Sequence, residues 1–214
     1  MSLKFYFAPW STAGITEAVL NELERGQSKL AERIEVSFKN GDTRKQEYLD
    51  NVNPNGLVPV IVHDGVSIWE SAAITIYLGD LYGVERKLYP EPGPRRGEAM
   101  KWIVWSNVSL ATQIGRYGEF VNLDSSKDQT EAEKQNKKMN YEAASKEMDK
   151  LFGILDNALK GKDYLLGDMY TLADTHIWSF MGYLDMLKYD REKFANVKAW
   201  TERVGARPAL KDVK

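Results

Sequence analysis

The sequence contains no cysteine in its 214 residues. Disulfides, thiolate metal sites, a cysteine nucleophile and a dithiol redox pair are therefore excluded. Any thiol chemistry has to use a thiol that a ligand brings. Histidine is scarce too, with two in the chain: His63 before an Asp-Gly turn, predicted at the surface, and His176 in an apolar helical pattern, predicted as a satisfied core residue. Neither suggests a metal site.

Long apolar runs and an excess of charge are also missing. No run approaches the roughly 18 apolar residues of a membrane span, and the N-terminus is unlike a signal peptide. The formal net charge of -2 gives no electrostatic case for nucleic acid or for an anionic membrane. With 43% hydrophobic residues, the composition is that of a globular protein. We therefore expect a cytoplasmic protein whose partners are small molecules.

Strand and helix patterns alternate over residues 1–83. This order, strand, helix, strand, helix, strand, strand, helix, is typical of a thioredoxin-like α/β domain, although the redox cysteines of thioredoxin are absent. The predicted elements are strands over residues 3–7 and 34–38, a helix over 14–25, a short irregular helix over 42–51, a hairpin that ends at residue 71, and a helix over 72–82.

The pattern becomes entirely helical after a linker rich in proline and glycine over residues 84–96. Residues 97–214 are predicted to form an all-helical bundle domain. Its predicted elements are an amphipathic helix over 98–121, a polar break over 123–129, a second long helix that buries Ala144, Met148, Leu151, Phe152, Leu155 and Leu159, a central buried helix behind the Thr171–Asp174 capping box, and a last helix over 194–204.

The stretch from Asn53 to Ser71 predicts a hairpin with a ligand-binding tip. Pro59 stands at the start of a strand, a position where cis prolyl bonds occur. A cis bond would leave the backbone N–H and C=O of Val58 free to pair with a peptide-like ligand. At the other end, the Ser71 hydroxyl and the free N–H groups of a helix start suit a carboxylate, and Glu70 suits an ammonium group. A free amino acid carries both groups on one carbon.

This stretch resembles a known family. The Asn-Pro-x-Gly-x-Val-Pro run, the Asp-Gly turn and the Glu70-Ser71 pair resemble the glutathione-binding half of cytosolic glutathione transferases. The Thr171–Asp174 box resembles the one that starts the central helix of their second domain. The resemblance implies a homodimeric detoxification enzyme with no metal that takes glutathione as substrate or cosubstrate and adds its thiolate to a hydrophobic electrophile.

The resemblance also implies a hydroxyl that stabilises the glutathione thiolate. Members of the serine-type classes carry a catalytic serine after the first strand, so Ser11 is our first choice, and Thr12 and Tyr6 are the alternatives. A hydrogen bond from a hydroxyl favours the charged form of a thiol. We expect the electrophile pocket between the turn around Trp10 and the helix over residues 98–121.

The rest of the tripeptide is assigned by the same resemblance. Val58 and Pro59 are predicted to bind the cysteinyl unit, and Glu70 and Ser71 the gamma-glutamyl end. The glycine carboxylate needs a cation. Lys45 is the first choice for this cation, with Lys39 and Arg44 as alternatives, and Leu57 departs from the polar residue that several classes carry before Val-Pro.

Two other kinds of function stay open at this point. The same fold serves as a binding or interaction module in elongation-factor subunits and regulatory relatives. Glutathione is also used as a cofactor by isomerases, dehalogenases, etherases and peroxidases. The thiolate step is common to all the enzymes, so the residues do not separate them.

Overall fold

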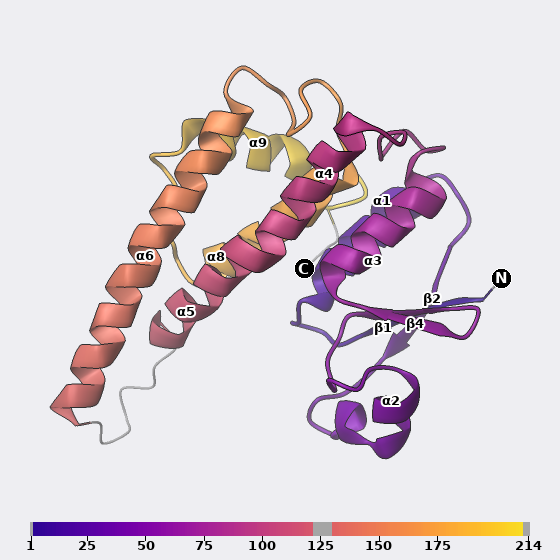
Figure 1. Ribbon diagram of the computed structural model, residues 1–214, viewed down its shortest axis with the longest axis horizontal. Helices are drawn as coiled ribbons and strands as arrows, with labels where there is room; N and C mark the ends of the chain where they lie inside the picture. The colour runs from indigo at the N-terminus through magenta and orange to yellow at the C-terminus, as the bar shows by residue number, and fades with distance from the viewer. Residues whose placement is uncertain (1, 122–129, 212–214) are drawn as a thin grey trace.

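The computed structural model describes residues 2–121 and 130–211, and the predicted break over residues 123–129 lies outside them. Figure 1 shows the strands with α1 to α3 on one side of the molecule and the helices α4 to α9 on the other. The elements are β1 (Leu3–Phe7), α1 (Ala13–Glu24), β2 (Glu32–Glu35), η1 (Asp42–Arg44), α2 (Gln46–Asn51), β3 (Val60–His63), β4 (Val66–Trp69), α3 (Ser71–Leu78), η2 (Gly79–Gly83), α4 (Pro94–Trp105), η3 (Ser106–Leu110), α5 (Ala111–Val121), α6 (Glu131–Leu159), α7 (Leu172–Trp178), α8 (Met181–Met186) and α9 (Ala195–Gly205).

The N-terminal sheet has the strand order β2-β1-β3-β4. β1 runs parallel to β2, and β3 runs antiparallel to both β1 and β4. The predicted thioredoxin-like arrangement is therefore confirmed. β2 begins at Glu32, earlier than predicted, and Phe38 is exposed instead of lying in the strand. The strand ends early because β1 ends at Phe7, whose carbonyl makes the last bond of this ladder to the Val36 N–H.

The C-terminal part is helical, as predicted, with three differences in detail. α4 already begins at Pro94, because a proline in the first helical turn has no N–H to lose there. The predicted continuous helix also contains a π-helical segment, η3, between α4 and α5. The predicted central helix is divided into α7 and α8 at Ser179 and Phe180.

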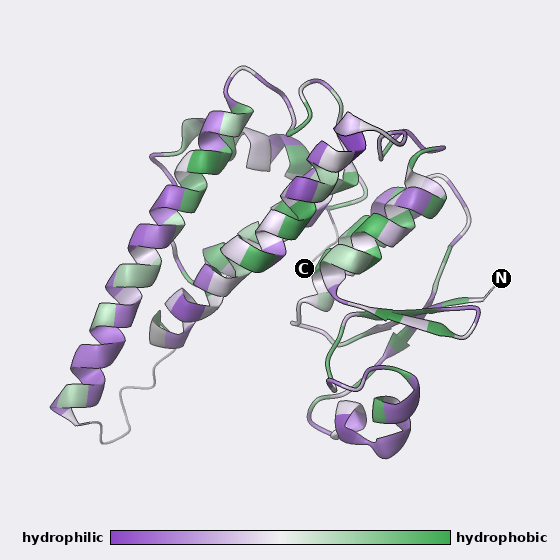
Figure 2. Ribbon diagram, viewed as in Figure 1, coloured by the Kyte–Doolittle hydropathy of each residue, from purple (hydrophilic) through white to green (hydrophobic). Residues whose placement is uncertain are grey.

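The long helix α6 buries the six residues that its spacing predicts. Figure 2 shows α6 as mostly hydrophilic and α3 as mostly hydrophobic. A reciprocal capping box of Thr130 and Glu133 starts α6, and the predicted box of Thr171 and Asp174 starts α7. The buried Asp174 carboxylate also accepts hydrogen bonds from Leu165 N–H and from the Trp200 indole, both at 2.9 Å. One carboxylate thus ties α7 to the loop before it and to α9.

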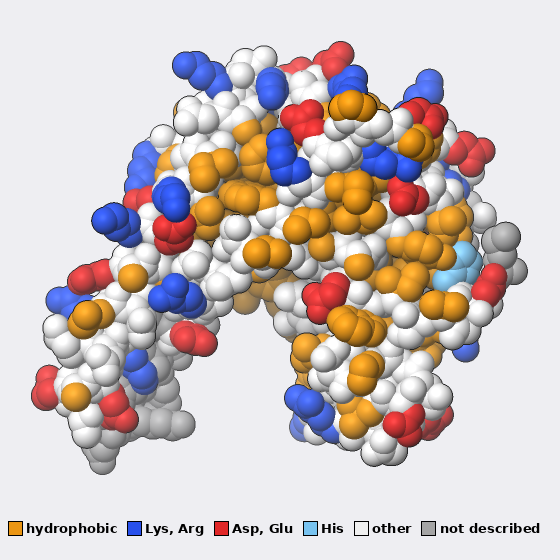
Figure 3. Space-filling view, in the orientation of Figure 1, with side chains coloured by type: hydrophobic (Ala, Val, Ile, Leu, Met, Phe, Trp, Pro, Cys, Tyr) orange, Lys and Arg blue, Asp and Glu red, His pale blue; other side chains and the backbone are white. Residues whose placement is uncertain are grey.

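Two surface features are visible in Figure 3. A deep notch separates the N-terminal domain from the far ends of α5 and α6, and hydrophobic side chains gather over α3 and α4. Among the described residues, no helix is both long and apolar enough to span a membrane.

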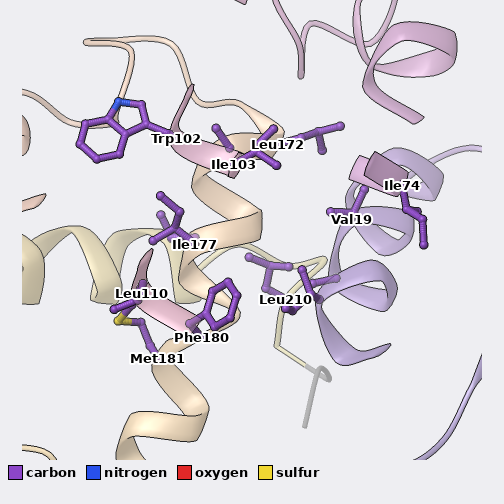
Figure 4. Close-up of a cluster of buried hydrophobic side chains, with 14 of the residues drawn as sticks. Val19, Ile74, Trp102, Ile103, Leu110, Leu172, Ile177, Phe180, Met181 and Leu210 are labelled. Atoms are coloured by element: carbon purple, nitrogen blue, oxygen red, sulfur yellow. The ribbon is translucent and has the colours of Figure 1, made fainter. Parts of the chain in front are cut away.

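The hydrophobic core continues across the boundary between the two halves. Phe5 of the sheet is fully buried and belongs to this core. Figure 4 shows Val19 of α1 and Ile74 of α3 on one side of a cluster that includes Ile103 of α4 and Ile177 of α7 on the other. Burial of apolar surface is the main stabilising term in folding. The shared core therefore holds the two walls of the site described next in one fixed arrangement.

Candidate active site

The turn after β1 meets the loop before β3. The Val58–Pro59 peptide bond is cis, in line with the position of the proline at a strand start. Thr12 Oγ1 donates to the Val58 carbonyl at 3.3 Å. The prediction that this carbonyl is free was therefore wrong. The Val58 N–H finds no acceptor within the described part of the chain. A ligand that offers a carbonyl oxygen can therefore pair with it.

Two side-chain hydrogen bonds fix the backbone of the loop before Val58. Tyr48 Oη donates to the Leu57 carbonyl at 2.8 Å, and Asn53 Nδ2 donates to the same oxygen at 2.9 Å. Burial raises the pKa of Tyr48 to about 12, so its hydroxyl stays protonated and remains a donor. Leu57 itself is exposed.

The hydroxyl of Ser11 lies in the turn that starts α1. Ser11 Oγ donates to the Ala8 carbonyl at 2.6 Å and accepts from Ala13 N–H at 3.2 Å. The structure brings Ser11 and Thr12 to the same edge as Val58. Tyr6 is elsewhere, packed edge-to-face on Tyr48 with ring centroids 6.1 Å apart, in a cavity between the sheet and α2.

Glu70 and Ser71 stand at the start of α3. Glu70 is exposed and has φ 71°, a left-handed backbone that costs a non-glycine residue roughly 1–3 kcal/mol and is often found at ligand sites. Ser71 is buried and is the first residue of α3, where backbone N–H groups have no helical acceptor. Ser71 Oγ accepts a hydrogen bond from Asn107 Nδ2 at 2.9 Å. Because Asn107 follows α4, the helical domain reaches directly into this site, a contact that sequence reasoning missed.

The structure confirms the predicted environment of one histidine and contradicts that of the other. His176 is fully buried and bonded on both ring nitrogens, so the prediction of a satisfied core histidine is confirmed. Burial lowers the pKa of His176 to about 3 and keeps the ring neutral. His63 is not a surface residue as predicted, because its side chain is 10% exposed and lies 2.7 Å from Tyr77 Oη through Nδ1. In the residues that the structure describes, no group of three or more acidic or histidine side chains could hold a metal.

The three basic residues predicted as partners of a ligand carboxylate differ in their contacts within the protein. Lys45 Nζ is 2.6 Å from Asp42 Oδ1, and Lys39 is exposed on the preceding loop. Arg44 instead lies against Gly56 of the loop before Val58, where a Cβ would come 2.9 Å from Arg44 Nη1. Gly56 also has φ 65°, so glycine is needed there for two reasons. Among the described residues, nothing forms an ion pair or hydrogen bond with the Arg44 guanidinium.

A cavity of about 580 Å³ opens beside Ser11. Its lining is mostly apolar and consists of Trp10, Ser11, Gly14, Trp178, Ser179, Met181, Gly182, Tyr183, Asp185, Met186, Thr201 and Gly205. Trp10 is 81% exposed at its rim. Tyr183 Oη donates to the Ser11 carbonyl at 2.7 Å, and burial raises the pKa of Tyr183 to about 12. The rest of this lining comes from α7, α8 and α9. The predicted electrophile pocket between the Trp10 turn and the helix over residues 98–121 stays a prediction.

The turn at Ser11 and Thr12 takes part in both halves of the site. Ser11 lines the apolar cavity, and Thr12 contacts the Val58 carbonyl. The pairing of Val60 with Trp69 brings the start of α3 close to the Val58 loop. A ligand with a peptide backbone, an amino-acid head and a reactive group between them would place the reactive group at the Ser11 turn. Such a site is suited to bring a polar peptide thiol next to an apolar molecule.

Both halves of the chain match models of known protein domains. Residues 25–81 match the model of the glutathione S-transferase N-terminal domain, and residues 118–208 match that of the C-terminal domain. Glutathione S-transferase GstB of Escherichia coli (strain K12) is 32% identical over 164 residues, which cover 76% of this chain and 75% of that protein. Glutathione S-transferase 2 of Schizosaccharomyces pombe is 29% identical over 199 residues, with 84% and 82% of the two chains covered.

Solved structures share the fold over nearly the whole chain. The glutathione transferase BgramDRAFT_1843 of Burkholderia graminis, with two glutathione molecules bound per subunit, has a TM-score of 0.83 at 25% identity and covers 99% of this chain and 87% of that one. Ure2p in complex with glutathione has a TM-score of 0.83 at 23% identity, with 100% and 98% covered. Because both halves match the family models and a relative above 30% identity is covered over three quarters of its length, this chain belongs to the glutathione S-transferase family.

Proposed function

We propose that this protein is a glutathione transferase that holds glutathione as its thiolate and adds it to hydrophobic electrophiles. The observation that carries the proposal is that the turn at Ser11 and Thr12 lines an apolar cavity through Ser11 and contacts the Val58 backbone through Thr12. The family relationship supports it, as do the fold neighbours that were solved with glutathione bound. The reaction class, thiol addition to a carbon electrophile, follows from the two kinds of surface that meet at this turn.

In this proposal, glutathione binds along the Val58 loop and the start of α3. The Val58 N–H is free to bind the carbonyl of its cysteinyl unit. Glu70 binds the ammonium group, and Ser71 with the N–H groups at the start of α3 binds the carboxylate of the gamma-glutamyl end. Arg44 becomes the first choice for the glycine carboxylate, because Lys45 is already paired with Asp42.

Ser11 is proposed to stabilise the sulfur. The thiol proton leaves to solvent, and the thiolate then forms a bond to the electrophilic carbon while the leaving group departs with its bonding electrons. Ser11 can serve as donor once its hydroxyl turns from the Ala8 carbonyl to the sulfur, and its bond from Ala13 N–H survives that rotation. Thr12 is the competing donor, because its hydroxyl already reaches Val58.

Separate substitutions distinguish these two hydroxyls. We expect Ser11→Ala to raise the pKa that governs kcat/KM with an activated aryl halide by about 1–2 units, the value of one hydrogen bond to a charged group. Thr12→Val should shift this pKa by less. The matched control is Ser145→Ala, in the middle of α6 and outside the site, which should leave the profile unchanged. A wild-type profile in Ser11→Ala would remove Ser11 from this role.

A binding module without catalysis is the second candidate, and one observation favours it. The Ser11 hydroxyl is fully engaged with the backbone, donating at 2.6 Å and accepting at 3.2 Å. If glutathione raises the melting temperature while a panel of electrophiles gives no turnover, the protein binds glutathione without using its thiol. If millimolar glutathione produces no shift, the binding proposal itself fails.

A homodimer is proposed from the surface over α3 and α4. Large apolar side chains that are 37–67% exposed lie there and in the neighbouring segments, namely Trp69, Leu81, Met100, Val104 and Val108. An exposed apolar area of this kind is typical of an interface with another chain. Val104→Glu should give a monomer in light scattering, whereas Met139→Glu on the outer part of α6 should not. A monomeric wild-type protein would contradict the proposal.

A further inference from the structure

A chain of buried polar side chains connects the core of the helical domain to Ser71. Thr75 Oγ1 is 2.8 Å from His176 Nδ1, and His176 Nε2 is 2.7 Å from Asn107 Oδ1. Asn107 Nδ2 is in turn 2.9 Å from Ser71 Oγ. Thr75 and His176 are fully buried, Ser71 is 6% exposed, and the three links join α3, η3 and α7. The His176 ring is neutral, so it donates at one nitrogen and accepts at the other.

The hydrogen bonds of this chain can run in two directions. In the first, Thr75 donates to His176 Nδ1, His176 Nε2–H donates to Asn107 Oδ1, and Asn107 donates to Ser71 Oγ. In the second, every donor and acceptor is reversed and the Asn107 amide is turned over. The second direction leaves the Thr75 hydroxyl proton without an acceptor in the described part of the chain. The first direction leaves the Ser71 hydroxyl proton without an acceptor instead, but Ser71 is 6% exposed at the candidate site, whereas Thr75 is 0% exposed. An unpaired donor that neither water nor a ligand can reach costs about 1–3 kcal/mol, so the first direction is favoured.

The direction decides what Ser71 can do. When Asn107 donates to Ser71 Oγ, the Ser71 hydroxyl proton stays free, since no described residue accepts it, and it lies beside the unpaired N–H groups at the start of α3. Ser71 is then a donor and suits an anion. In the reversed direction Ser71 would give its proton to Asn107 and could only accept, which suits an ammonium group.

We propose that His176 and Asn107 are positioning residues that make the Ser71 hydroxyl a donor to the α-carboxylate of the gamma-glutamyl group. This inference rests on the proposed binding of glutathione. Neither residue touches the ligand in this proposal. His176 sets the orientation of the Asn107 amide, and the Asn107 amide sets the direction of the Ser71 hydroxyl.

The test compares three ligands that differ only at the amino-acid end. These are glutathione, glutaryl-cysteinyl-glycine, which keeps the carboxylate and lacks the ammonium group, and 4-aminobutyryl-cysteinyl-glycine, which keeps the ammonium group and lacks the carboxylate. Their dissociation constants are measured by titration calorimetry. We expect His176→Phe and Asn107→Ala to weaken glutathione and the glutaryl analogue about tenfold or more, the value of one hydrogen bond to a charged group. Binding of the aminobutyryl analogue should be nearly unchanged.

Two variants separate positioning from simple destabilisation. His176→Gln keeps one donor and one acceptor and should recover most of the carboxylate-dependent affinity. Ile177→Val, next to His176 and equally buried, should lower stability without changing the ratio between the ligands. If His176→Phe does not fold, Asn107→Ala carries the test, because Asn107 is half-buried.

Specific outcomes would overturn the inference. Equal loss for all three ligands would mean that the chain only supports the fold. A loss for glutathione and the aminobutyryl analogue, with binding of the glutaryl analogue unchanged, would mean that the hydrogen bonds run in the opposite direction. If the wild-type protein binds none of the ligands, the proposed function fails first. If the wild-type protein binds glutathione, and the variants His176→Phe and Asn107→Ala bind it equally well, only the inference about His176 and Asn107 fails.

Discussion

The ion pair between Glu22 and Arg207 gives the most direct test of how the two halves of the chain are held together. Glu22 lies in α1, and Arg207 follows α9. Arg207 donates from Nε to Glu22 Oε1 at 2.6 Å and from Nη2 to Oε2 at 2.8 Å. Tyr170 Oη donates to the same carboxylate at 3.1 Å, and the guanidinium lies 3.5 Å from the Tyr170 ring centroid. The Glu22 side chain is 1% exposed and that of Arg207 is 22% exposed.

Arg207→Met would remove the charge and keep most of the apolar stem. Removing one partner of a buried pair costs about 3–5 kcal/mol, because the other charge stays buried alone. We expect the lower end, about 3 kcal/mol, since Arg207 is partly in contact with water. At roughly 2–4 °C per kcal/mol for a chain of this size, the melting temperature should fall by about 6–12 °C.

The assay is thermal unfolding followed by circular dichroism at one protein concentration and without glutathione. The matched control is Arg203→Met in α9, whose ion pair with Asp163 is 3.4 Å long and has partners 37% and 67% exposed. An exposed pair contributes about 0–1 kcal/mol, so the shift should be a few degrees at most. The double variant Glu22→Leu/Arg207→Met should recover much of the loss, and Tyr170 keeps its bond with Thr175 at 2.6 Å. A drop in Arg207→Met no larger than in Arg203→Met would refute the reasoning.

Three further predictions concern stability. Burial lowers the pKa of His176 to about 3 against about 6.5 in the unfolded chain, so unfolding takes up a proton between these values. The stability contribution of the neutral ring is therefore complete above pH 6.5 and is lost at about 1.4 kcal/mol per pH unit as the pH falls toward 3. The melting temperature of His176→Gln should therefore fall less steeply with decreasing pH than that of the wild type. Equal slopes of melting temperature against pH in the two proteins would contradict this. Gly83→Ala would bring a Cβ to 2.7 Å from Tyr89 Cβ and should destabilise the protein by about 1–3 kcal/mol. In Gly97→Ala, in α4, the new Cβ meets nothing within 4 Å, so this variant should stabilise the protein by about 0.5–1 kcal/mol. If the denaturant midpoints of the two variants move in the same direction, packing around the glycine is not the cause. Thr130→Ala removes the capping box of α6 and should cost about 1 kcal/mol in urea unfolding, and an unchanged midpoint would mean that this end of the helix is already frayed.

Local patterns in the sequence were sufficient for most of the fold. The six buried positions of α6, the capping box at Thr171 and the strand start at Pro59 each depend on neighbours within a few residues. Helix and strand periods, caps and turns are local properties, so they can be predicted without knowing the tertiary contacts. The boundaries were less predictable, because β2 ends where its partner β1 ends and α4 accepts a proline in its first turn.

The candidate site was only half visible in the sequence. Glu70 and Ser71 could be singled out because they stand at a helix start, and Ser11 because it follows a strand. Tyr183 could not, since it lies 172 positions from Ser11 and is brought there by the packing of the helical domain, where α7 contacts α1. No local pattern distinguishes such side chains from ordinary core.

His176 and Asn107 show most clearly which properties the local sequence determines and which ones depend on tertiary packing. The sequence by itself determined that His176 is a buried, hydrogen-bonded residue, because its helix is apolar nearly all round. Only the tertiary structure decided that its partners are Thr75 and Asn107, at separations of 101 and 69 residues. Burial is dictated by the local balance of apolar and polar residues, whereas the choice of a hydrogen-bond partner depends on atoms within about 3 Å, whose positions are set by how separate helices pack.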